Sequence, residues 1–207
     1  MTREEVQTLI DAPDPRTPAG IRDRAMLYLA FASGLRVSEL VGLRLDQLHF
    51  TPEAMLHVIG KGRRERILPL WKETTVALRA WLAVRDGRQD PALFLNASGR
   101  AMTRAGFEYI LAKHTAAAAR KQPSLSTKRV TPHILRHSCA MHMLQATRDI
   151  RRVSLWLGHA SLQSTEIYLR ADPTEKLEAL TAITPLSLRR GQFRPPDALI
   201  ALLQENG

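Results

Sequence analysis

Two histidines, two arginines, a lysine and a tyrosine could together attack a phosphodiester without help from a metal. Such a reaction needs a nucleophile, cations against the non-bridging oxygens of the phosphate, and a proton for the departing oxygen. Arginine suits the second role because its planar fork donates two hydrogen bonds to a phosphate and stays charged. The residues that fit these roles come from separated segments: Arg36, Lys61, His133, Arg136, His159 and Tyr168.

Four of these residues fall within residues 131–168, where the spacing predicts three successive helices. Thr131 is a plausible cap for the first helix, and Pro132 suits its first turn. His133 and Arg136 are three residues apart and therefore share one face of that helix. An imidazole and a guanidinium are thus expected to point the same way.

The second helix is expected from about Asp149 to Leu157, ending at Gly158. Ser161 is predicted to cap a third helix that carries Tyr168. Inside that helix, His159 would lie about 13 Å from Tyr168 along the axis. In a turn before the cap, the imidazole can instead fold back towards the phenol.

Taken singly, each of these residues has a structural explanation. A cation in a turn is usually solvated, a tyrosine on a helix usually packs, and a histidine after a glycine often only marks a helix end. Spacing alone therefore leaves the structural and the catalytic interpretations open.

Composition narrows the class of partner. The 207 residues can form one large domain or two small ones, and the formal net charge of +10 favours a polyanion, nucleic acid before membrane. Aromatic residues make up 5%, which argues against base stacking as the mode of binding. The single cysteine, Cys139, excludes an internal disulfide, and the longest apolar run, 25–32, is too short to span a bilayer. We expect a cytoplasmic protein with no membrane segment.

The periodicity predicts a mainly α fold with a small β-hairpin or sheet (α+β). Apolar strands at 56–59 and 67–70 enclose Gly60-Lys61-Gly62-Arg63-Arg64-Glu65-Arg66, a hairpin with a highly basic tip. Either Trp71 or Trp81 is expected to face the core. Further helices are expected at 2–10, 21–33, 37–43, 72–84, 103–119, 173–183 and 197–204.

The chain resembles the tyrosine recombinases, the phage-integrase family, over nearly all of residues 2–180. Each motif alone is moderately specific, but their order and separation make a strong match. The stretches that carry the resemblance are Ala32-Ser33-Gly34-Leu35-Arg36-Val37-Ser38-Glu39-Leu40, Gly60-Lys61-Gly62, His133-Ile134-Leu135-Arg136-His137, and Leu157-Gly158-His159 followed nine residues later by Tyr168.

The resemblance implies the fold of that family's catalytic domain and a role for each matched position. Arg36 and Arg136 look like the pair that clamps the scissile phosphate. Lys61 looks like the acid that protonates the departing 5′ oxygen. Tyr168 looks like the nucleophile that forms a 3′-phosphotyrosyl link. Glu39 matches the family's acidic support residue.

His133 and His159 look like hydrogen-bond and proton-transfer partners of the phosphate and the nucleophile. The covalent intermediate conserves bond energy, so no nucleotide cofactor is needed. A metal is not implied either: His133 and His137 are four residues apart, but the glutamate of a His-Glu-x-x-His motif is missing.

Basic residues outside this set are expected to hold the DNA backbone. Such contacts position a duplex without reading its sequence. The best matches lie at the hairpin tip and in a loop before residue 131: Arg63, Arg64, Arg66, Lys121, Lys128 and Arg129.

Residues 1–183 are expected to form the catalytic domain, and 184–207 a linker and tail helix. We expect the family's N-terminal core-binding domain to be absent from this chain. The chain would then be an excised domain, a truncated product or a naturally short recombinase. The tail either docks on a neighbouring protomer in a tetrameric synapse on double-stranded DNA or packs on its own domain. The outcome, whether integration, excision, inversion or transposition, is open. A non-catalytic DNA-binding fragment and a type IB topoisomerase are the alternative functions.

Overall fold

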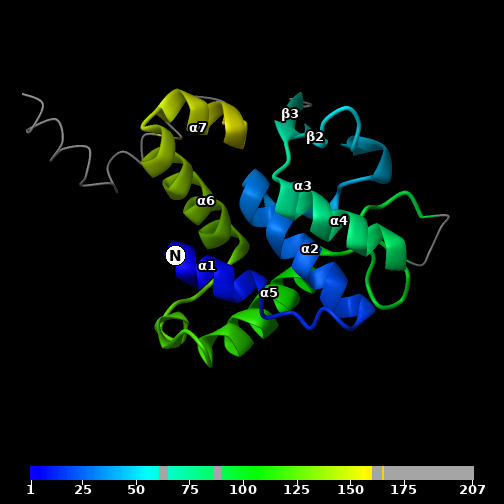
Figure 1. Cartoon of the computed structure of the whole chain (residues 1–207), viewed down its shortest axis with the longest axis horizontal. Helices are drawn as coiled ribbons and strands as arrows, with labels where there is room; N and C mark the ends of the chain where they lie inside the picture. The colour runs from blue at the N-terminus through cyan, green and yellow to red at the C-terminus, as the bar shows by residue number, and fades with distance from the viewer. Residues whose placement is uncertain (61–64, 86–89, 160–164, 166–207) are drawn as a thin grey trace, which may run out of the picture. The chain divides into compact units, whose positions relative to one another are not determined.

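Helix α2 lies at the centre of the described part of the protein, with the other helices and a small sheet packed around it (Figure 1). The computed structural model describes residues 1–60, 65–85, 90–159 and 165, all within one compact unit, Met1–Asp172. The elements in chain order are α1 (Arg3–Ile10), α2 (Pro18–Ser33), α3 (Val37–Val41), the 3-10 turn η1 (Leu45–Gln47), β1 (Leu48–His49), β2 (Met55–Ile59), β3 (Glu65–Pro69), α4 (Lys72–Val84), α5 (Arg104–Ala119), the 3-10 turn η3 (Pro123–Leu125), α6 (Pro132–Thr147) and α7 (Ile150–Leu157).

Helix α2 begins three residues before the predicted start at Ile21. Thr17 caps it, because the hydroxyl of Thr17 accepts a hydrogen bond of 3.0 Å from the backbone N–H of Gly20. Pro18 occupies the first turn, where its missing N–H costs nothing. The predicted start at Ile21 was therefore wrong, because the cap and the proline outweigh the glycine at position 20.

The sheet has three antiparallel strands in the order β1-β2-β3. Strands β2 and β3 form the predicted hairpin, with Ile59 opposite Glu65 at the end next to residues 61–64. Strand β1 was not predicted, because two residues are too few to show an alternation of apolar and polar side chains.

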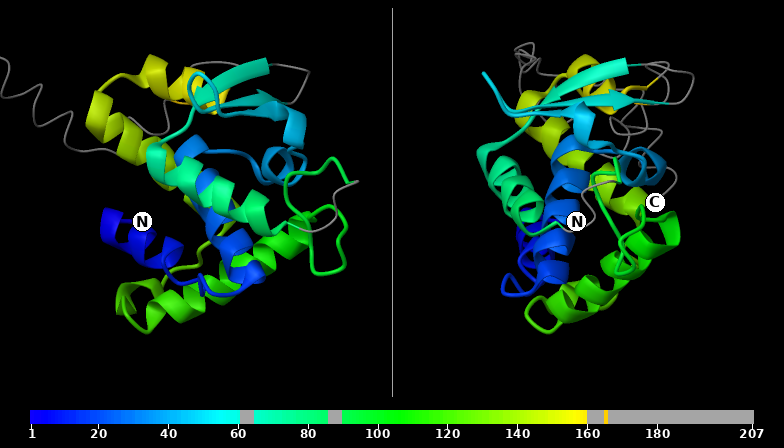
Figure 2. Two further views of the ribbon diagram at one scale, coloured as in Figure 1. Left: turned by 45° about the vertical axis from the view of Figure 1, so that its right-hand side comes forward. Right: turned by 90° about the vertical axis from the view of Figure 1, so that its right-hand side faces the viewer.

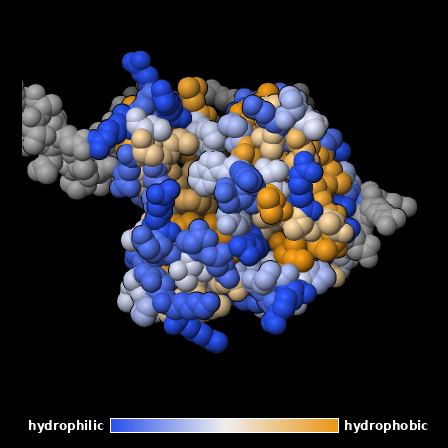
Figure 3. All heavy atoms as spheres, viewed as in Figure 1, coloured by the Kyte–Doolittle hydropathy of each residue, from blue (hydrophilic) through white to orange (hydrophobic). Residues whose placement is uncertain are grey.

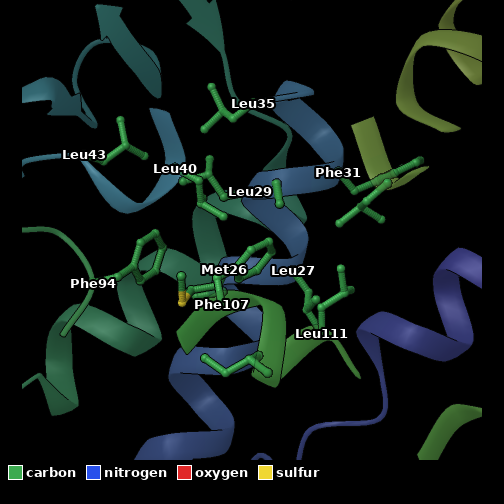
Figure 4. Packing of buried hydrophobic residues seen from close by; sticks show 14 of the residues in the cluster. Met26, Leu27, Leu29, Phe31, Leu35, Leu40, Leu43, Phe94, Phe107 and Leu111 are labelled. Carbon is green, nitrogen blue, oxygen red and sulfur yellow. The ribbon is translucent and has the colours of Figure 1, made fainter. Parts of the chain in front are cut away.

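The main hydrophobic core forms along α2 (Figure 4). Met26 and Leu29 of α2 have no exposed surface. Phe107 and Leu111 from α5 pack around them, together with Phe94 from the segment before it. Of the two tryptophans considered for the core, Trp81 is 5% exposed and Trp71 is 48% exposed.

Helices α6 and α7 form a second, smaller cluster of buried side chains: Ala140, Leu144, Val153 and Leu157. The indole N–H of Trp156 on α7 donates to the carbonyl of Ala32 near the end of α2, at 3.2 Å. Both views in Figure 2 show α7 and the strands β2 and β3 at the same end of the unit. This end of the unit therefore holds the end of α2, the end of α7 and the hairpin.

The observed architecture confirms the expected class, mainly helical with a small antiparallel sheet.

Apolar residues gather over the α4 side of the face in Figure 3, and Val76 on that helix is 59% exposed. Within the described residues, no helix combines the length and apolar character needed to cross a membrane. The predicted helices at 173–183 and 197–204, the linker between them and the helix of Tyr168 lie outside the described residues.

Candidate active site

The turn after α2 positions Arg36 in the candidate site. Gly34 ends α2 with a φ of 55°, in the left-handed region that glycine adopts without strain. A Cβ at this position would lie 2.6 Å from Cδ2 of Leu157 and 3.1 Å from Sγ of Cys139. Glycine is therefore needed both for the backbone conformation and for close contact with α6 and α7.

Glu39 on α3 lies at the centre of the candidate site. Its carboxylate, 4% exposed, accepts hydrogen bonds from the backbone N–H of Arg36 at 2.9 Å and from Nη1 of Arg36 at 3.1 Å. It also pairs with both terminal nitrogens of Arg66, at 3.2 and 2.8 Å. Nη1 of Arg136 lies 3.9 Å away. Three guanidinium groups thus surround one buried carboxylate.

Those cations keep Glu39 ionised. Burial by itself would raise the pKa of the Glu39 carboxyl, but hydrogen bonds from Arg66 and the backbone of Arg36, with the positive charges of both arginines, outweigh it and lower the pKa. An ionised carboxylate is the form that accepts several hydrogen bonds at once. Glu39 can therefore orient its arginine neighbours at neutral pH.

Arg136 is buried on α6, with its side chain 6% exposed. Nη1 donates to the carbonyl of Gly34, and Nη2 donates to the carbonyl of Leu157 at 2.9 Å. These carbonyls stand at the ends of α2 and α7. The guanidinium of Arg136 therefore ties together the two helix ends that lead into Arg36 and His159.

His159 follows the end of α7. Gly158 adopts a φ of 63°, and His159 lies in a turn, as predicted. The backbone N–H of His159 donates to the carbonyl of Ser154 at 3.1 Å, and its Nδ1 lies 2.7 Å from the hydroxyl of Thr165. Both the backbone and the imidazole of His159 are thus restrained.

The charge state of His159 reflects the cluster around it. Burial lowers its pKa first, and the positive charges of Arg136, Arg36 and Arg66 add to that effect, while Glu39 opposes it. The pKa falls to about 4. The imidazole is therefore neutral at neutral pH.

His133 stands in the first turn of α6, which Thr131 caps by accepting a hydrogen bond of 3.2 Å from the N–H of Ile134. The His133 side chain is exposed, three residues before Arg136. His137, on the same helix, is half-buried, and burial followed by the nearby charge of His133 lowers its pKa.

The structure brings Arg36, Glu39, Arg136 and His159 together. Lys61, Tyr168, Arg63 and Arg64 lie outside the described residues, although strands β2 and β3 flank the hairpin tip that carries three of them.

The remaining basic residues divide into two groups. Lys121 and Arg129 are exposed, and Lys128 is 42% exposed while its ammonium lies 2.6 Å from the carboxylate of Glu5. Arg66, in contrast, is turned inward, with its side chain 10% exposed. The sequence predicted that Arg66, with Arg63 and Arg64 of the hairpin tip, contacts the DNA backbone.

A signal for the inward position of Arg66 was present in the sequence. Side chains alternate along a strand, so Arg66 shares a face with Leu68, which is 2% exposed, while Ile67 between them is 65% exposed. The alternation in β3 therefore puts Arg66 on the buried face. Its inward position was missed because a charged side chain is usually exposed.

Comparison with known proteins identifies the family of this chain. The model of the phage integrase family matches residues 1–175. A putative integrase/recombinase, y4rC of Sinorhizobium fredii, is 46% identical over 203 residues, which cover 98% of this chain and 61% of that protein. The tyrosine recombinase XerD of Listeria innocua is 40% identical over 171 residues, 80% of this chain and 55% of that protein.

A solved structure shares the fold. The crystal structure of the XerH site-specific recombinase, bound to its palindromic difH substrate in a post-cleavage complex, superposes with a TM-score of 0.70 at 25% identity. The match covers 88% of this chain and 52% of XerH. This chain thus spans little more than half the length of these proteins. The match to the family model over residues 1–175, together with these relatives, shows that the chain belongs to the phage integrase family, the tyrosine recombinases.

Proposed function

We propose that this chain is the catalytic part of a site-specific recombinase that cuts and rejoins double-stranded DNA in the cytoplasm. The cluster in which Arg36 and Arg136 approach the carboxylate of Glu39, with His159 in the same electrostatic field, carries the proposal. The DNA complex of XerH supports the same kind of substrate. Residues 1–183 would form the catalytic domain, and 184–207 a linker and tail.

In the proposed reaction the phenol oxygen of Tyr168 attacks the scissile phosphorus. An O–P bond forms to the tyrosine as the bond from phosphorus to the 5′ oxygen breaks, which leaves a 3′-phosphotyrosyl link. Lys61 gives the 5′ oxygen its proton, and the phenol proton passes to His133. The reverse sequence, with a 5′ hydroxyl from another strand as the nucleophile, rejoins the DNA.

The arginines and His159 stabilise the charge on the phosphate. Arg36 and Arg136 donate hydrogen bonds to the non-bridging oxygens, on which negative charge builds up. A neutral imidazole with a pKa near 4 is a weak proton acceptor. His159 therefore fits the role of hydrogen-bond donor to a phosphate oxygen, a role that both the neutral and the charged imidazole can fill.

The DNA backbone would be held by exposed cations. Lys121 and Arg129 are free to approach it from the loop before α6, and Arg63 and Arg64 would do so from the hairpin tip. Lys128 is partly engaged by Glu5 and would contribute less. Each phosphate contact of this kind steepens the dependence of log K on log salt concentration by about 0.9.

We further propose that four copies assemble on DNA in a synapse and that the tail, 184–207, docks on a neighbouring protomer. Leu199, Leu202 and Leu203 give the tail an apolar stripe, and Pro195 and Pro196 precede it. Sedimentation of the DNA complex with and without residues 192–207 tests this: truncation should reduce the assembly. Identical sedimentation would mean that the tail packs on its own domain.

A nicked suicide substrate that a longer relative cleaves tests the chemistry. The chain should form a covalent adduct with it, and Tyr168→Phe should abolish the adduct while leaving the DNA affinity almost unchanged. Tyr109→Phe is the matched control, because Tyr109 is 71% exposed on α5.

Two outcomes would contradict the proposal. Absence of an adduct with the native chain would indicate a DNA-binding fragment without cleavage activity. Relaxation of supercoiled plasmid without exchange between sites would indicate a type IB topoisomerase.

A further inference from the structure

We propose that Arg66 is a positioning residue: its guanidinium holds the carboxylate of Glu39, and through it Arg36, in the orientation that clamps the scissile phosphate. The inference rests on the proposed recombinase function of the same site. It assigns to Arg66 a role other than contact with the DNA backbone.

The pair between Arg66 and Glu39 is two-pronged and buried. Nη1 lies 3.2 Å from Oε1 and Nη2 lies 2.8 Å from Oε2, with the two side chains 10% and 4% exposed. Two parallel hydrogen bonds fix the plane of the carboxylate as well as its position. Lysine would supply the charge without that geometry.

Arg36 depends on the orientation of the same carboxylate. Oε1 accepts from Nη1 of Arg36, and Oε2 accepts from its backbone N–H. Each oxygen of Glu39 therefore serves both Arg36 and Arg66. A rotation of the carboxylate that followed the loss of Arg66 would shift the guanidinium of Arg36, whose side chain is 40% exposed.

Arg66 also packs against the turn that carries His159. A Cβ on Gly158 would lie 2.9 Å from Nη1 and 3.2 Å from Cζ of Arg66. The guanidinium thus fills the space between α3 and the end of α7, directly before His159. Its charge is one of those that lower the pKa of that imidazole.

The strand register makes Arg66 a rigid anchor. It pairs with Val58 across β2 and β3, and Val58 is 1% exposed. The backbone of Arg66 is therefore fixed by the sheet, while its side chain reaches Glu39. The same two strands lead to the hairpin tip with Lys61. The side chain of Arg66 therefore connects the hairpin to Glu39 and Arg36 and to the turn that carries His159.

The test compares single-turnover formation of the covalent adduct with DNA affinity, measured separately. Arg66→Met should slow adduct formation by at least about tenfold, the scale expected when a catalytic group is misplaced. DNA affinity should change little. Arg66→Lys should recover part of the rate. Arg104→Met is the matched control: it also removes one arginine paired with a glutamate, Glu108, but at an exposed site on α5.

A double-mutant cycle identifies the route of the effect. If Arg66 acts through Glu39, combining Arg66→Met with Glu39→Gln should be no slower than the slower single variant. Fully additive losses would overturn the inference, as would an Arg66→Met rate equal to that of Arg104→Met. A loss confined to DNA affinity, with a shallower salt dependence, would make Arg66 a backbone contact instead.

Two controls separate this inference from other failures. Thermal melting followed by circular dichroism shows whether each variant folds. If Arg66→Met does not fold, Arg66→Lys decides: an intermediate rate supports the inference, and a native rate overturns it. If the native chain itself forms no adduct, the proposed function fails, whereas a native adduct with unaffected Arg66 variants defeats only the role of Arg66.

Discussion

His159 is partly buried and lies in the field of three guanidinium groups, and burial followed by that field explains why the imidazole is neutral. Burial, then Arg136, Arg36 and Arg66, lower its pKa to about 4. The same cations suit the single negative charge of a phosphodiester, whose arrival changes the field. The charge state of this one residue therefore reports on whether the cluster receives an anion.

Binding of DNA should raise the pKa of His159. The negative charge of the scissile phosphate offsets the arginines and favours the charged imidazole. An NMR titration of the imidazole, in the free chain and in a complex of the Tyr168→Phe variant with uncleaved DNA, measures the change. A pKa that stays near 4 or falls in the complex would place the phosphate elsewhere.

The depressed pKa also has a consequence for stability. The folded pKa of about 4 is below the usual histidine pKa of 6.5, so the unfolded chain binds a proton that the folded chain resists. Stability should therefore fall as the pH drops from about 6.5 towards 4. His159→Gln should reduce this pH dependence, and His49→Gln, at an exposed position in β1, should not.

At the scale of elements, helix α1 anchors the loop that leads into α6. The carboxylate of Glu5, 1% exposed, accepts hydrogen bonds from Ser124 at 2.5 Å and Lys128 at 2.6 Å. Glu5 also completes the capping box of its own helix with Thr2. One side chain therefore connects α1 to the loop that precedes His133.

Glu5→Gln should lower the free energy of unfolding by about 1–3 kcal/mol, the value of hydrogen bonds to a buried charged group. Burial by itself would raise the pKa of Glu5, but hydrogen bonds from Lys128, Ser124 and Thr2 lower it to about 2, below the usual glutamate pKa of 4.5. The stabilisation is therefore present above about pH 4.5 and is lost as the pH falls towards 2.

Chemical denaturation across this pH range checks the prediction. The difference between the native chain and Glu5→Gln should shrink on acidification. Glu4→Gln, an exposed neighbour on the same helix, serves as the control. A difference that is constant with pH would mean that the charge of Glu5 does not stabilise the fold.

Local chemistry made much of the element order predictable. Thr131 caps α6 and Gly158 ends α7, as predicted, and α7 begins directly after Asp149, the residue near which its start was expected. The start of α2 was misplaced because a cap and a proline compete with a glycine in the same stretch. Strand β1 was not predicted, because its two residues form a strand only through their pairing with β2.

At the scale of the molecule, the site depends on contacts between residues far apart in the sequence. The pair of Arg66 with Glu39 spans 27 positions, and the bond from Arg136 to Gly34 spans 102. Periodicity and capping carry no information about such contacts. The resemblance identified Arg36, Glu39, Arg136 and His159 as one set, but only the folded chain shows that Arg66 joins them.

The buried network around Asp23 illustrates the same limit. Asp23 on α2 accepts from Arg22 at 2.6 Å and lies 2.8 Å from Nε2 of His114 on α5, 91 residues away. In the sequence, His114 is an ordinary histidine on an alanine-rich helix. Its burial follows from the packing of two helices that local patterns cannot place against each other.

The central claim is that Tyr168 reaches the phosphate held by this cluster, and mapping the site of DNA attachment tests it most directly. The covalent adduct would be digested with trypsin, and the nucleotide-bearing peptide identified by mass spectrometry. The chain has three tyrosines, Tyr28, Tyr109 and Tyr168, so each falls in a distinguishable peptide. We predict a 3′-phosphate link on Tyr168 within the peptide 153–170, which also carries His159. Attachment at Tyr28 or Tyr109, or through a 5′-phosphate, would contradict the account.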